Sequence, residues 1–320
     1  MAPREPAADY AGSFHVPVLC HAVVEALVTS LGGPYVDGTL GGGGHTAALL
    51  DAGATVVGVD RDREAIDATR RRLSTRVSSG QLRTIHGNFA ELEALLANEG
   101  ITGVRGLLLD LGVSSHQIDT SRRGFSYRID APLDMRMSSD EDLDAADIIN
   151  RWSERELRQL LREYGEEPRA ARIARKVVAA RPVNSTGQLA RIVRAAVNIR
   201  REAKTLSRVF QAVRIAVNDE LRNLEKALLA AEHILERGGR MAVISYHSLE
   251  DRRVKRTFRY GNVRGEPVRD VFGTPISPWR AMTRRPITPD DREIVANPRA
   301  RSARLRVAER TSTTATATAC

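Results

Sequence analysis

The feature that most constrains this fold is a run of glycines between a short apolar segment and a helix. Residues 35–37 predict a strand that leads into Gly-Thr-Leu-Gly-Gly-Gly-Gly at 38–44, and residues 45–51 predict the helix. Glycines let the backbone approach a ligand without a Cβ clash, and a helix N-terminus offers free N–H groups with a partial positive charge. The turn therefore predicts a ligand site.

The pattern around this turn alternates between strands and helices. β-Branched or apolar runs predict strands, and amphipathic runs between them predict helices. The run at 106–110 ends on an acid, as a central parallel strand does at its carboxyl edge. Repeated β-α-β units predict a parallel, doubly wound α/β sheet. The further strands are expected at 55–60, 82–86 and 240–245, with helices at 63–73, 90–97 and 207–236.

This rhythm is interrupted between residues 111 and 205. Residues 111–137 form a long polar stretch with almost no periodicity, which in a compact domain is usually functional. Short helices follow, for which Asp140 and Ser153 are the expected N-caps. We expect disordered ends at 1–13 and 309–320, an α/β domain from 14–139 and 206–308, and an all-helical insertion at 140–205.

Charge is concentrated near the C-terminus. The net charge is +9, and residues 251–306 hold 15 basic and 6 acidic side chains. This imbalance favours a surface that binds a polyanion, although a solvated arginine-rich face is the plain alternative.

The two cysteines exclude a disulfide framework and a cysteine-rich zinc site. With no secretory signal and no apolar run of membrane-spanning length, we expect a cytoplasmic protein without a membrane partner.

Four positions at the ends of the expected strands are candidates for a nucleoside site. Asp60 is placed to accept both ribose hydroxyls, and Asn88-Phe89 to flank an adenine. Asp110 follows the fourth strand. A structural turn, a core phenylalanine and a capping aspartate are the competing interpretations. The glycine spacing does not fit the G-x-G-x-x-G of nicotinamide proteins and suits a smaller, carboxylate-bearing ligand better.

Eight ordered blocks within residues 14–308 closely resemble the ribosomal RNA small subunit methyltransferase H family, the MraW proteins. The blocks occupy 15–27, 36–50, 58–66, 107–119, 123–137, 210–221, 238–255 and 297–306. The resemblance implies a class I, Rossmann-like domain with an inserted all-helical domain. It also implies S-adenosylmethionine (SAM)-dependent methylation of a cytosine N4 in the decoding region of 16S (small-subunit) ribosomal RNA.

Site residues follow from matching these blocks. The resemblance implies cofactor contacts at Gly43, Gly44, His45, Asp60, Phe89, Asp110 and Gln117. His45 and Gln117 rest on the resemblance alone. The resemblance also implies free rRNA or the assembled small subunit as the partner, and it suggests a homodimer. Two departures are His116 in place of a common proline, and the stretch 204–209, which lacks a common Pro-Ala-Thr-Arg.

The chemistry requires an acceptor near the target amine. The cytosine N4 lone pair is delocalised, so the site must accept a hydrogen bond and later a proton from N4. We expect Asp110 or a nearby carbonyl to do so, supported by Ser114 or Ser115. Transfer from a sulfonium requires no metal. Phe125 or Tyr127 is a candidate stacking residue for the flipped base, or else packs on the body.

Other assignments stay open from the sequence. Arg299, Arg301, Arg304 and Arg306 are candidate phosphate contacts. The block His247–Glu250–Asp251 follows the last predicted strand, with a structural cluster as the alternative to a functional role. A methyltransferase acting on DNA or another RNA, and a non-enzymatic assembly factor that keeps a SAM pocket, are the competing functions.

Overall fold

The computed structural model describes residues 17–30, 33–113, 121–138, 140–197 and 202–311. They form two compact units, one from residues up to Gly112 and from Asn223 onward, and the other from Val113 to Arg222. The predicted insertion at 140–205 lies within the second unit. That unit extends further on both sides because Leu133 and Met135 before it, and Val213 after it, belong to the same helical core.

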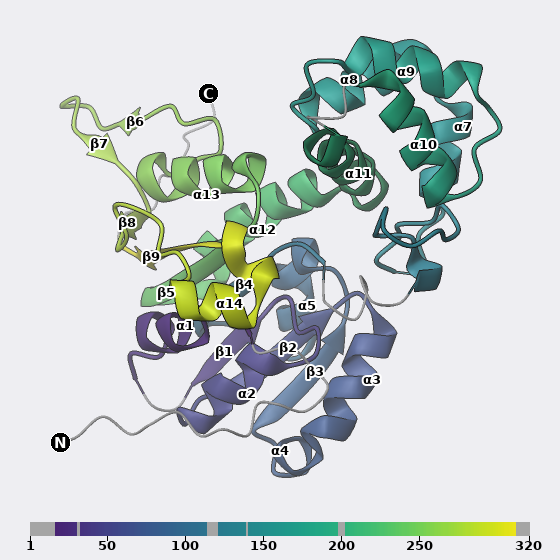
Figure 1. Ribbon diagram of the computed structural model, residues 1–320. Helices are drawn as coiled ribbons and strands as arrows, with labels where there is room; N and C mark the ends of the chain where they lie inside the picture. Colours follow the sequence, from purple (N-terminus) through teal and green to yellow (C-terminus); the bar gives the residue numbers. More distant parts are fainter. Residues whose placement is uncertain (1–16, 31–32, 114–120, 139, 198–201, 312–320) are drawn as a thin grey trace. The chain divides into compact units, whose positions relative to one another are not determined.

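The first unit contains a seven-stranded sheet in the order β3-β2-β1-β4-β5-β9-β8 (Figure 1). Each of its five parallel strands ends at the residue predicted from the apolar runs. The strands are β1 (Pro34–Asp37), β2 (Thr55–Asp60), β3 (Leu82–His86), β4 (Val104–Asp110) and β5 (Leu235–Ser245). Neighbours β1 and β4 run parallel while the chain order reverses between them, which is the switch point where such sheets bind ligands.

Two strands on the far side of β5 were not predicted. β9 (Arg304–Arg310) pairs antiparallel with β5, and β8 (Trp279–Ala281) pairs with β9. The predicted tail at 309–320 is therefore wrong for Glu309 and Arg310, which pair with Arg240 and Trp279. The tail's remaining residues from 312 lie outside the described part. The fold class, a Rossmann-like α/β sheet with an all-helical part, is confirmed.

Helices cover both faces of this sheet. One face packs against α5 (Leu92–Asn98), α12 (Glu220–Ile234) and α13 (Ser248–Tyr260) through residues such as Leu96, Leu228 and Phe258. The other packs against α1 (Cys20–Leu27) and α2 (Gly44–Asp51) through Val23, Leu27 and Leu49. Further helical segments of this unit are α3 (Arg63–Arg72), α4 (Ser74–Ser78), η1 (Phe89–Glu91), α14 (Asp291–Ala296) and η4 (Pro298–Ser302).

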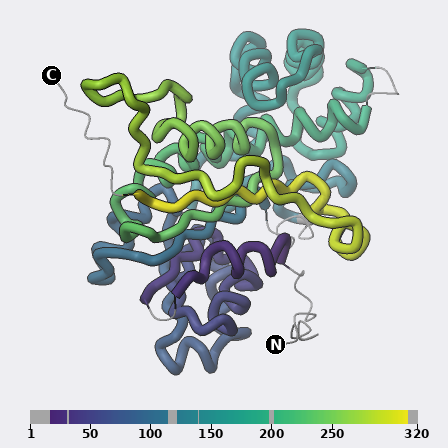
Figure 2. Tube along the Cα trace, turned by 90° about the vertical axis from the view of Figure 1, so that its left-hand side faces the viewer, coloured from purple at the N-terminus to yellow at the C-terminus, as the bar shows by residue number. Residues whose placement is uncertain are grey.

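A hairpin of β6 (Val268–Arg269) and β7 (Pro275–Ile276) follows α13. In both ribbon and tube views it projects from the body of the first unit (Figures 1 and 2). Among the residues with a described position, no helix combines the length and apolar character needed to cross a membrane.

The second unit is helical. It contains η2 (Ser121–Arg123), α7 (Ala145–Arg151), α8 (Glu154–Glu163), α9 (Ala170–Ala179), α10 (Thr186–Ala196) and α11 (Glu202–Asn218). The N-cap prediction for Ser153 is confirmed, since its hydroxyl accepts from the Glu156 N–H at 3.2 Å. The prediction for Asp140 is wrong, because α7 begins later and Asp144 caps it, accepting from the Asp147 N–H at 2.8 Å.

The single helix predicted over 207–236 is two helices. Asp219 lies between α11 and α12 with φ of 47°, a left-handed conformation that an L-residue adopts only where its surroundings impose it. The preceding Asn218 is buried and bonds the backbone of Met135 and Met137. The amphipathic period continues across this break, so the sequence pattern did not reveal it.

Candidate functional site

The turn after β1 is organised by a buried carboxylate. Asp37 is 1% exposed, and its Oδ2 accepts from the Thr46 hydroxyl at 2.7 Å. Its Oδ1 accepts from the Thr39 N–H at 3.2 Å. Burial is the largest influence and raises the pKa of Asp37. This carboxylate therefore ties the end of β1 to the first turn of α2, and it stabilises the shape of the glycine turn.

Glycine is required in this turn for two different reasons. Gly43 has φ of 71°, and a Cβ there would lie 2.6 Å from Cγ2 of Thr69. Gly38 has no unusual φ, but a Cβ would lie 2.6 Å from Leu109 and 3.4 Å from Phe89 Cβ. The Thr69 hydroxyl donates to the Gly41 carbonyl at 2.9 Å and thereby holds the far side of the turn. At Gly38 and Gly43 the turn packs too closely against β4 and α3 for a larger residue.

Asp60 ends β2 beside this turn. Its two carboxylate oxygens accept from the backbone N–H groups of Gly41 at 2.7 Å and Asp62 at 2.8 Å. Burial raises the pKa of Asp60 to about 6, against the lowering effect of these two bonds. A carboxylate has about four lone-pair positions, so two backbone bonds leave capacity for hydroxyl groups. The predicted hydroxyl acceptor is thus held rigidly at the sheet edge.

Asn88 and Phe89 follow β3. The Asn88 side chain accepts from the Ala90 N–H at 2.9 Å and caps η1, so its oxygen has a structural role. Phe89 is partly buried and packs against the apolar core of the sheet. Its Cβ lies near Gly38 in the glycine turn. Phe89 therefore packs against the core and also borders the turn, and its contact with an adenine stays a prediction.

Asp110 ends β4 and makes contacts from two neighbouring elements. Its Oδ1 accepts from the Tyr246 hydroxyl at 2.9 Å, and its Oδ2 lies 3.7 Å from Nδ1 of His45. The backbone N–H of Asp110 donates to the Thr39 hydroxyl at 2.7 Å. Burial raises the pKa of Asp110 to about 6, whereas His45 and the Tyr246 hydrogen bond lower it. The net effect is a carboxylate with a raised pKa that is still below neutral pH.

His45 is fixed by one bond. Its Nε2 lies 2.9 Å from the Val18 carbonyl, which can only accept, so Nε2 carries a proton. Its Nδ1 then faces the Asp110 carboxylate. The side chain is buried at 7% exposure. Its place between α2 and β4 agrees with the site role that the resemblance implied, and also with a packing role.

Tyr246 is the site residue that sequence reasoning missed. Burial and the Asp110 carboxylate raise the pKa of its phenol well above the ordinary value, so the hydroxyl stays protonated and donates. Glu250 accepts from the Tyr246 N–H at 2.8 Å and so orients its backbone. The signal was its position directly after β5, at the same sheet edge as Asp110.

The block after β5 is a structural cluster in the described contacts. Glu250 Oε1 lies 3.1 Å from His247 Nε2, and both side chains are nearly buried. The Asp251 carboxylate accepts from Nε and Nη2 of Arg306 at 2.6 and 3.2 Å. Asp251 thus joins α13 to β9, and Glu250 supports the residue that contacts Asp110.

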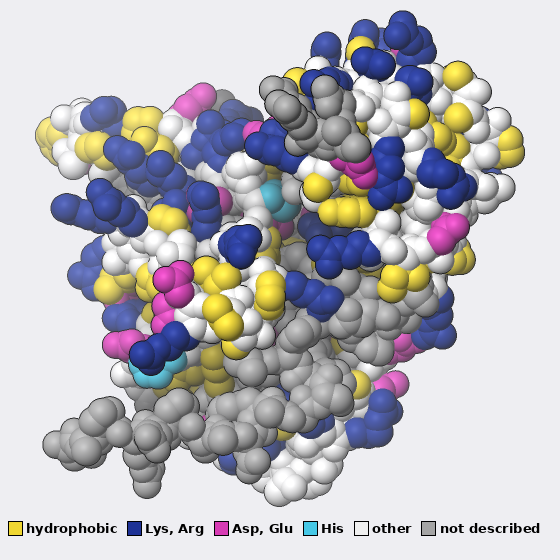
Figure 3. Space-filling view, viewed as in Figure 1, with side chains coloured by type: hydrophobic (Ala, Val, Ile, Leu, Met, Phe, Trp, Pro, Cys, Tyr) yellow, Lys and Arg dark blue, Asp and Glu magenta, His cyan; other side chains and the backbone are white. Residues whose placement is uncertain are grey.

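The four C-terminal arginines differ in exposure. Arg299 and Arg301 lie exposed in η4, and the Arg304 side chain is 52% exposed, with Nη1 3.4 Å from Asp251. The Arg306 side chain is only 8% exposed and is held by Asp251. Its guanidinium therefore has a structural partner where a phosphate contact was expected. Figure 3 shows many Lys and Arg side chains over α13, β8 and the hairpin, and others over the helices of the second unit.

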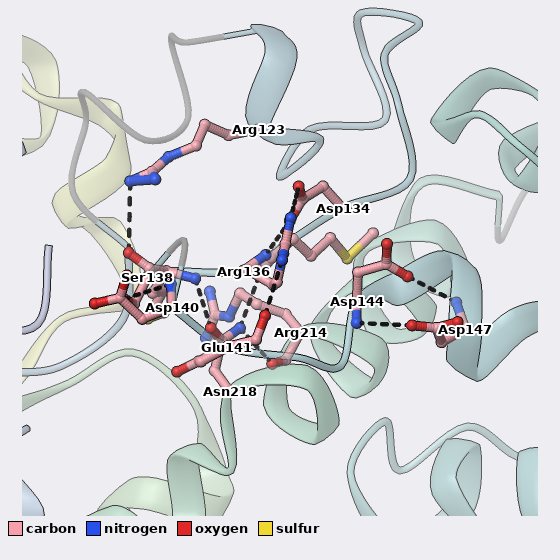
Figure 4. Close-up of polar contacts among 12 residues, drawn as sticks. Arg123, Asp134, Arg136, Ser138, Asp140, Glu141, Asp144, Asp147, Arg214 and Asn218 are labelled. Carbon is pink, nitrogen blue, oxygen red and sulfur yellow. Dashed lines mark hydrogen bonds and ion pairs between the residues drawn. The ribbon is translucent and has the colours of Figure 1, made fainter.

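In the second unit, residues 121–138 are held by polar contacts (Figure 4). Asp134 accepts from Nε and Nη2 of Arg136 at 2.9 and 3.0 Å, and Arg136 Nη1 donates to the Glu141 carbonyl at 2.8 Å. Asn218 of α11 accepts from the Met137 N–H at 2.7 Å. A stretch with no periodicity is thus fixed by side chains from its own unit.

The aromatic residues of this stretch pack on the helical core. Tyr127 meets Phe210 edge to face, with ring centroids 5.4 Å apart, and its hydroxyl lies 3.3 Å from the Ser207 hydroxyl. Phe125 is also partly buried against this core. These contacts favour the packing alternative over base stacking for Phe125 and Tyr127. The predicted residues Ser114, Ser115, His116 and Gln117 lie outside the described residues.

The structure thus brings Asp37, Asp60 and Asp110 to one edge of three adjacent strands, with Phe89 and His45 beside them. This edge offers a hydroxyl acceptor, a close backbone turn and a carboxylate whose pKa lies near 6. Such a set can bind a nucleoside-bearing ligand and can accept a proton beside it.

Comparison with known proteins identifies the same family that the sequence motifs resemble. A model of the MraW methylase family matches residues 12–311. The chain is 46% identical over 309 residues to Ribosomal RNA small subunit methyltransferase H of Geobacter sp. strain M21, covering 92% of this chain and 98% of the relative. It is 49% identical over 300 residues to the protein of that name from Deinococcus radiodurans, covering 92% and 89%.

Among solved structures, an rRNA methylase from Streptococcus thermophilus covers 92% of this chain and 94% of its own, with 14% identity and a TM-score of 0.39. That score is too low to add to what the strand order establishes. The family matches extend over nearly the whole sequence and include both units. The chain belongs to the MraW methylase family, as its motifs predicted.

Proposed function

We propose that this protein transfers the methyl group of SAM to the exocyclic N4 of a cytidine in the decoding region of 16S ribosomal RNA. The observation that carries the proposal is Asp110. This carboxylate lies at the switch point of the sheet, bordered by the glycine turn and held by Tyr246. Family membership and the relatives' names support small-subunit rRNA as the substrate.

The sheet edge fits SAM by its donors and acceptors. Asp60 has capacity for ribose hydroxyls beyond its two backbone bonds. Gly43 and Gly44 bring the N-terminus of α2 close to the edge, where its first N–H groups suit a carboxylate. Phe89 borders the same turn and offers an apolar surface for a purine. Gln117 remains a proposed further contact.

The reaction needs a base at N4. Bound SAM supplies a methyl group on a positively charged sulfur. As N4 forms its new bond to carbon, it must release a proton, and the Asp110 carboxylate is the proposed acceptor. Its raised pKa makes it a better base than an exposed aspartate while leaving it ionised at neutral pH. Ser114 and Ser115 are proposed to support the amine.

RNA binding is proposed for the exposed arginines. Arg299, Arg301 and Arg304 offer positive charge at the surface, whereas Arg306 is left out because Asp251 holds it. A triple alanine variant of the three exposed arginines should weaken RNA binding and flatten its salt dependence, because fewer counterions are released. An unchanged salt slope would remove these residues from the interface. A cytoplasmic location and a homodimer remain further proposals.

The testing experiment compares substrates. The purified protein is incubated with methyl-labelled SAM and, in parallel, unmethylated small subunits, naked small-subunit rRNA and plasmid DNA, and the product nucleosides are identified by mass spectrometry. N4-methylcytidine from subunits or rRNA is expected, and the better substrate shows which assembly state is used. Label in DNA alone would contradict the RNA assignment. SAM binding without label anywhere would favour an assembly factor.

A further inference from the structure

The hairpin of β6 and β7 carries two apolar side chains at its tip in full contact with water. Val271 is 93% exposed and Phe272 is 90% exposed. Large side chains such as phenylalanine are usually at least partly covered, because covering them is favourable by about 25 cal/mol for each Å² of apolar area. An aromatic ring left outside the fold indicates a surface that something else covers.

The tip is not a loose loop. Asp270 Oδ1 accepts from the N–H groups of Phe272 at 2.9 Å and Thr274 at 2.8 Å. The Gly273 N–H donates to the Asp270 carbonyl at 3.0 Å, and the Arg269 guanidinium donates to the Gly273 carbonyl at 2.5 Å. Gly273 has φ of 82°, which closes the turn. These bonds fix the backbone so that Phe272 points away from the body.

The surroundings of the tip are strongly basic. Residues 252–285 contain ten basic and two acidic side chains. Arg264 precedes β6, Arg269 lies in β6, and both are exposed. Arg256 of α13 lies against Gly265 at the base of the hairpin. Figure 3 shows this concentration of Lys and Arg side chains on the upper left of the view. An aromatic ring among arginines matches a nucleobase beside its phosphates.

A second copy of this chain fits the hairpin less well. Two apolar side chains bury far less than the roughly 1,000 Å² that a specific protein interface needs. The positive charge around them would also repel the same surface of another copy. A duplex offers no free base faces, whereas the unpaired bases of loops and single strands stack on aromatic side chains. The chemistry therefore selects unpaired RNA.

We propose that the hairpin tip is an RNA contact of this methyltransferase, in which Phe272 stacks on an unpaired base of the substrate while neighbouring arginines hold the phosphates. The proposal rests on the proposed rRNA substrate and adds a second contact region to it. In this proposal Phe272 acts only in substrate binding, and methyl transfer takes place at the carboxyl edge of the sheet.

The test uses the full-length protein with Phe272→Ala, Phe272→Tyr and Phe272→Leu. Val295→Ala is the matched control, since Val295 is 82% exposed on α14, outside the hairpin. Binding of a labelled decoding-region RNA fragment is measured over a series of salt concentrations. Phe272→Ala should raise Kd about 5- to 150-fold, the range that corresponds to loss of one stacked base. Tyr should restore binding and Leu should not.

The salt series separates stacking from charge. Phe272→Ala should shift Kd at every salt concentration with the slope unchanged, because no ion is released by a stacked ring. Arg264→Ala should instead reduce the slope. Wild-type affinity in Phe272→Ala would overturn the proposal. Full rescue by Leu would also overturn it, since it would show a plain apolar contact, and so would a changed oligomeric state with unchanged RNA affinity.

The same variants distinguish this proposal from the proposed function. Methyl transfer to small subunits is assayed in parallel, and Phe272→Ala should raise KM for the subunit. If the wild-type protein binds the RNA but methylates none of the substrates, the proposed activity fails. The stacking contact then stands or falls by the binding data alone.

Discussion

The carboxyl edge of the sheet and the arginine-rich segment after it use charge in opposite ways. At the edge, Asp37, Asp60 and Asp110 are mostly covered, and their carboxylates accept hydrogen bonds, two or more at Asp37 and Asp60 and one from the Tyr246 hydroxyl at Asp110. In the segment 251–306, most basic side chains face water. The enclosed carboxylates have raised pKa values, whereas the exposed guanidinium groups keep their charge available at long range.

Arg306 is the informative exception within the segment. It has the same residue type and nearly the same position as Arg304, but it pairs with Asp251 and is 6% exposed, in the same buried class as Asp37. The burial of a charged side chain, and not its residue type, therefore determines whether it stabilises the fold or is available to bind a substrate. Four substitutions test this distinction, in order of decreasing expected effect.

The largest effect is expected for Asp110→Asn. The amide keeps the size of the side chain but is not a base, so the turnover number at saturating SAM and RNA should fall about 10²- to 10⁴-fold. Asp37→Asn is the comparison variant, because Asp37 braces the turn and acts on Asp110 only through its charge. SAM affinity is measured separately by calorimetry. Full turnover of Asp110→Asn at saturating SAM would show that another group accepts the proton.

The next effect concerns stability. Arg306→Ala leaves the almost buried Asp251 with only the half-exposed Arg304 3.4 Å away, which should reduce the free energy of unfolding by about 3–5 kcal/mol. The exposed Arg301→Ala should change it by no more than about 0.5 kcal/mol. Thermal melting compares them. If Asp251→Asn does not recover part of the loss in Arg306→Ala, the loss of the buried Arg306–Asp251 ion pair is not the cause.

Gly43→Ala should have a smaller effect, about 1–3 kcal/mol on unfolding, and it should also weaken SAM binding. The new Cβ would combine a left-handed φ with a 2.6 Å contact to Thr69. Gly80→Ala is the matched control, since Gly80 has φ of 74° and nothing within 4 Å of the added atom. Their difference in melting temperature measures the contact alone. Equal effects would mean that only the backbone conformation matters.

The sequence was sufficient to predict which residues lie at the carboxyl edge of the sheet, because these residue types can occupy few other positions. Consecutive glycines, and acids that directly follow apolar strands, have a position fixed by the parallel sheet itself, so Asp60 and Asp110 were placed correctly. Tyr246 was missed because its partner is 136 residues away in the chain, and no local pattern indicates such a bond.

The arginine-rich segment was predicted less well for a similar reason. Each arginine has the same local appearance, and only the strand pairing of β9 with β5 buries Arg306 and leaves Arg304 half-exposed. The same pairing places Glu309 and Arg310, which were predicted to lie in a disordered tail, in strand β9. The break at Asp219 escaped notice because the apolar period continues through it. In each case a distant contact decided the outcome.

The smallest effect is expected for Tyr246→Phe, and pH reveals it. Methyl transfer requires ionised Asp110, so the rate at saturating SAM should rise with pH through about 6. The Tyr246 hydroxyl stabilises the ionised form and lowers that pKa, so its removal should move the acid limb to higher pH. The rate at pH 6 should then fall about 2- to 5-fold, with little change at pH 8.

Other charged groups face Asp110 as well. His45 lowers its pKa, and Asp37 and Glu250 raise it, so they must stay in place when Tyr246 is changed. Tyr35→Phe is the matched control, since it removes a hydroxyl that donates only to the Ser30 carbonyl at 2.9 Å. An acid limb at the same pH in Tyr246→Phe and wild type would show that the hydroxyl does not tune Asp110. A limb that moves in Tyr246→Phe and is absent in Asp110→Asn would identify Asp110 as the titrating group, because only the carboxylate that receives the lost hydrogen bond can respond to both changes.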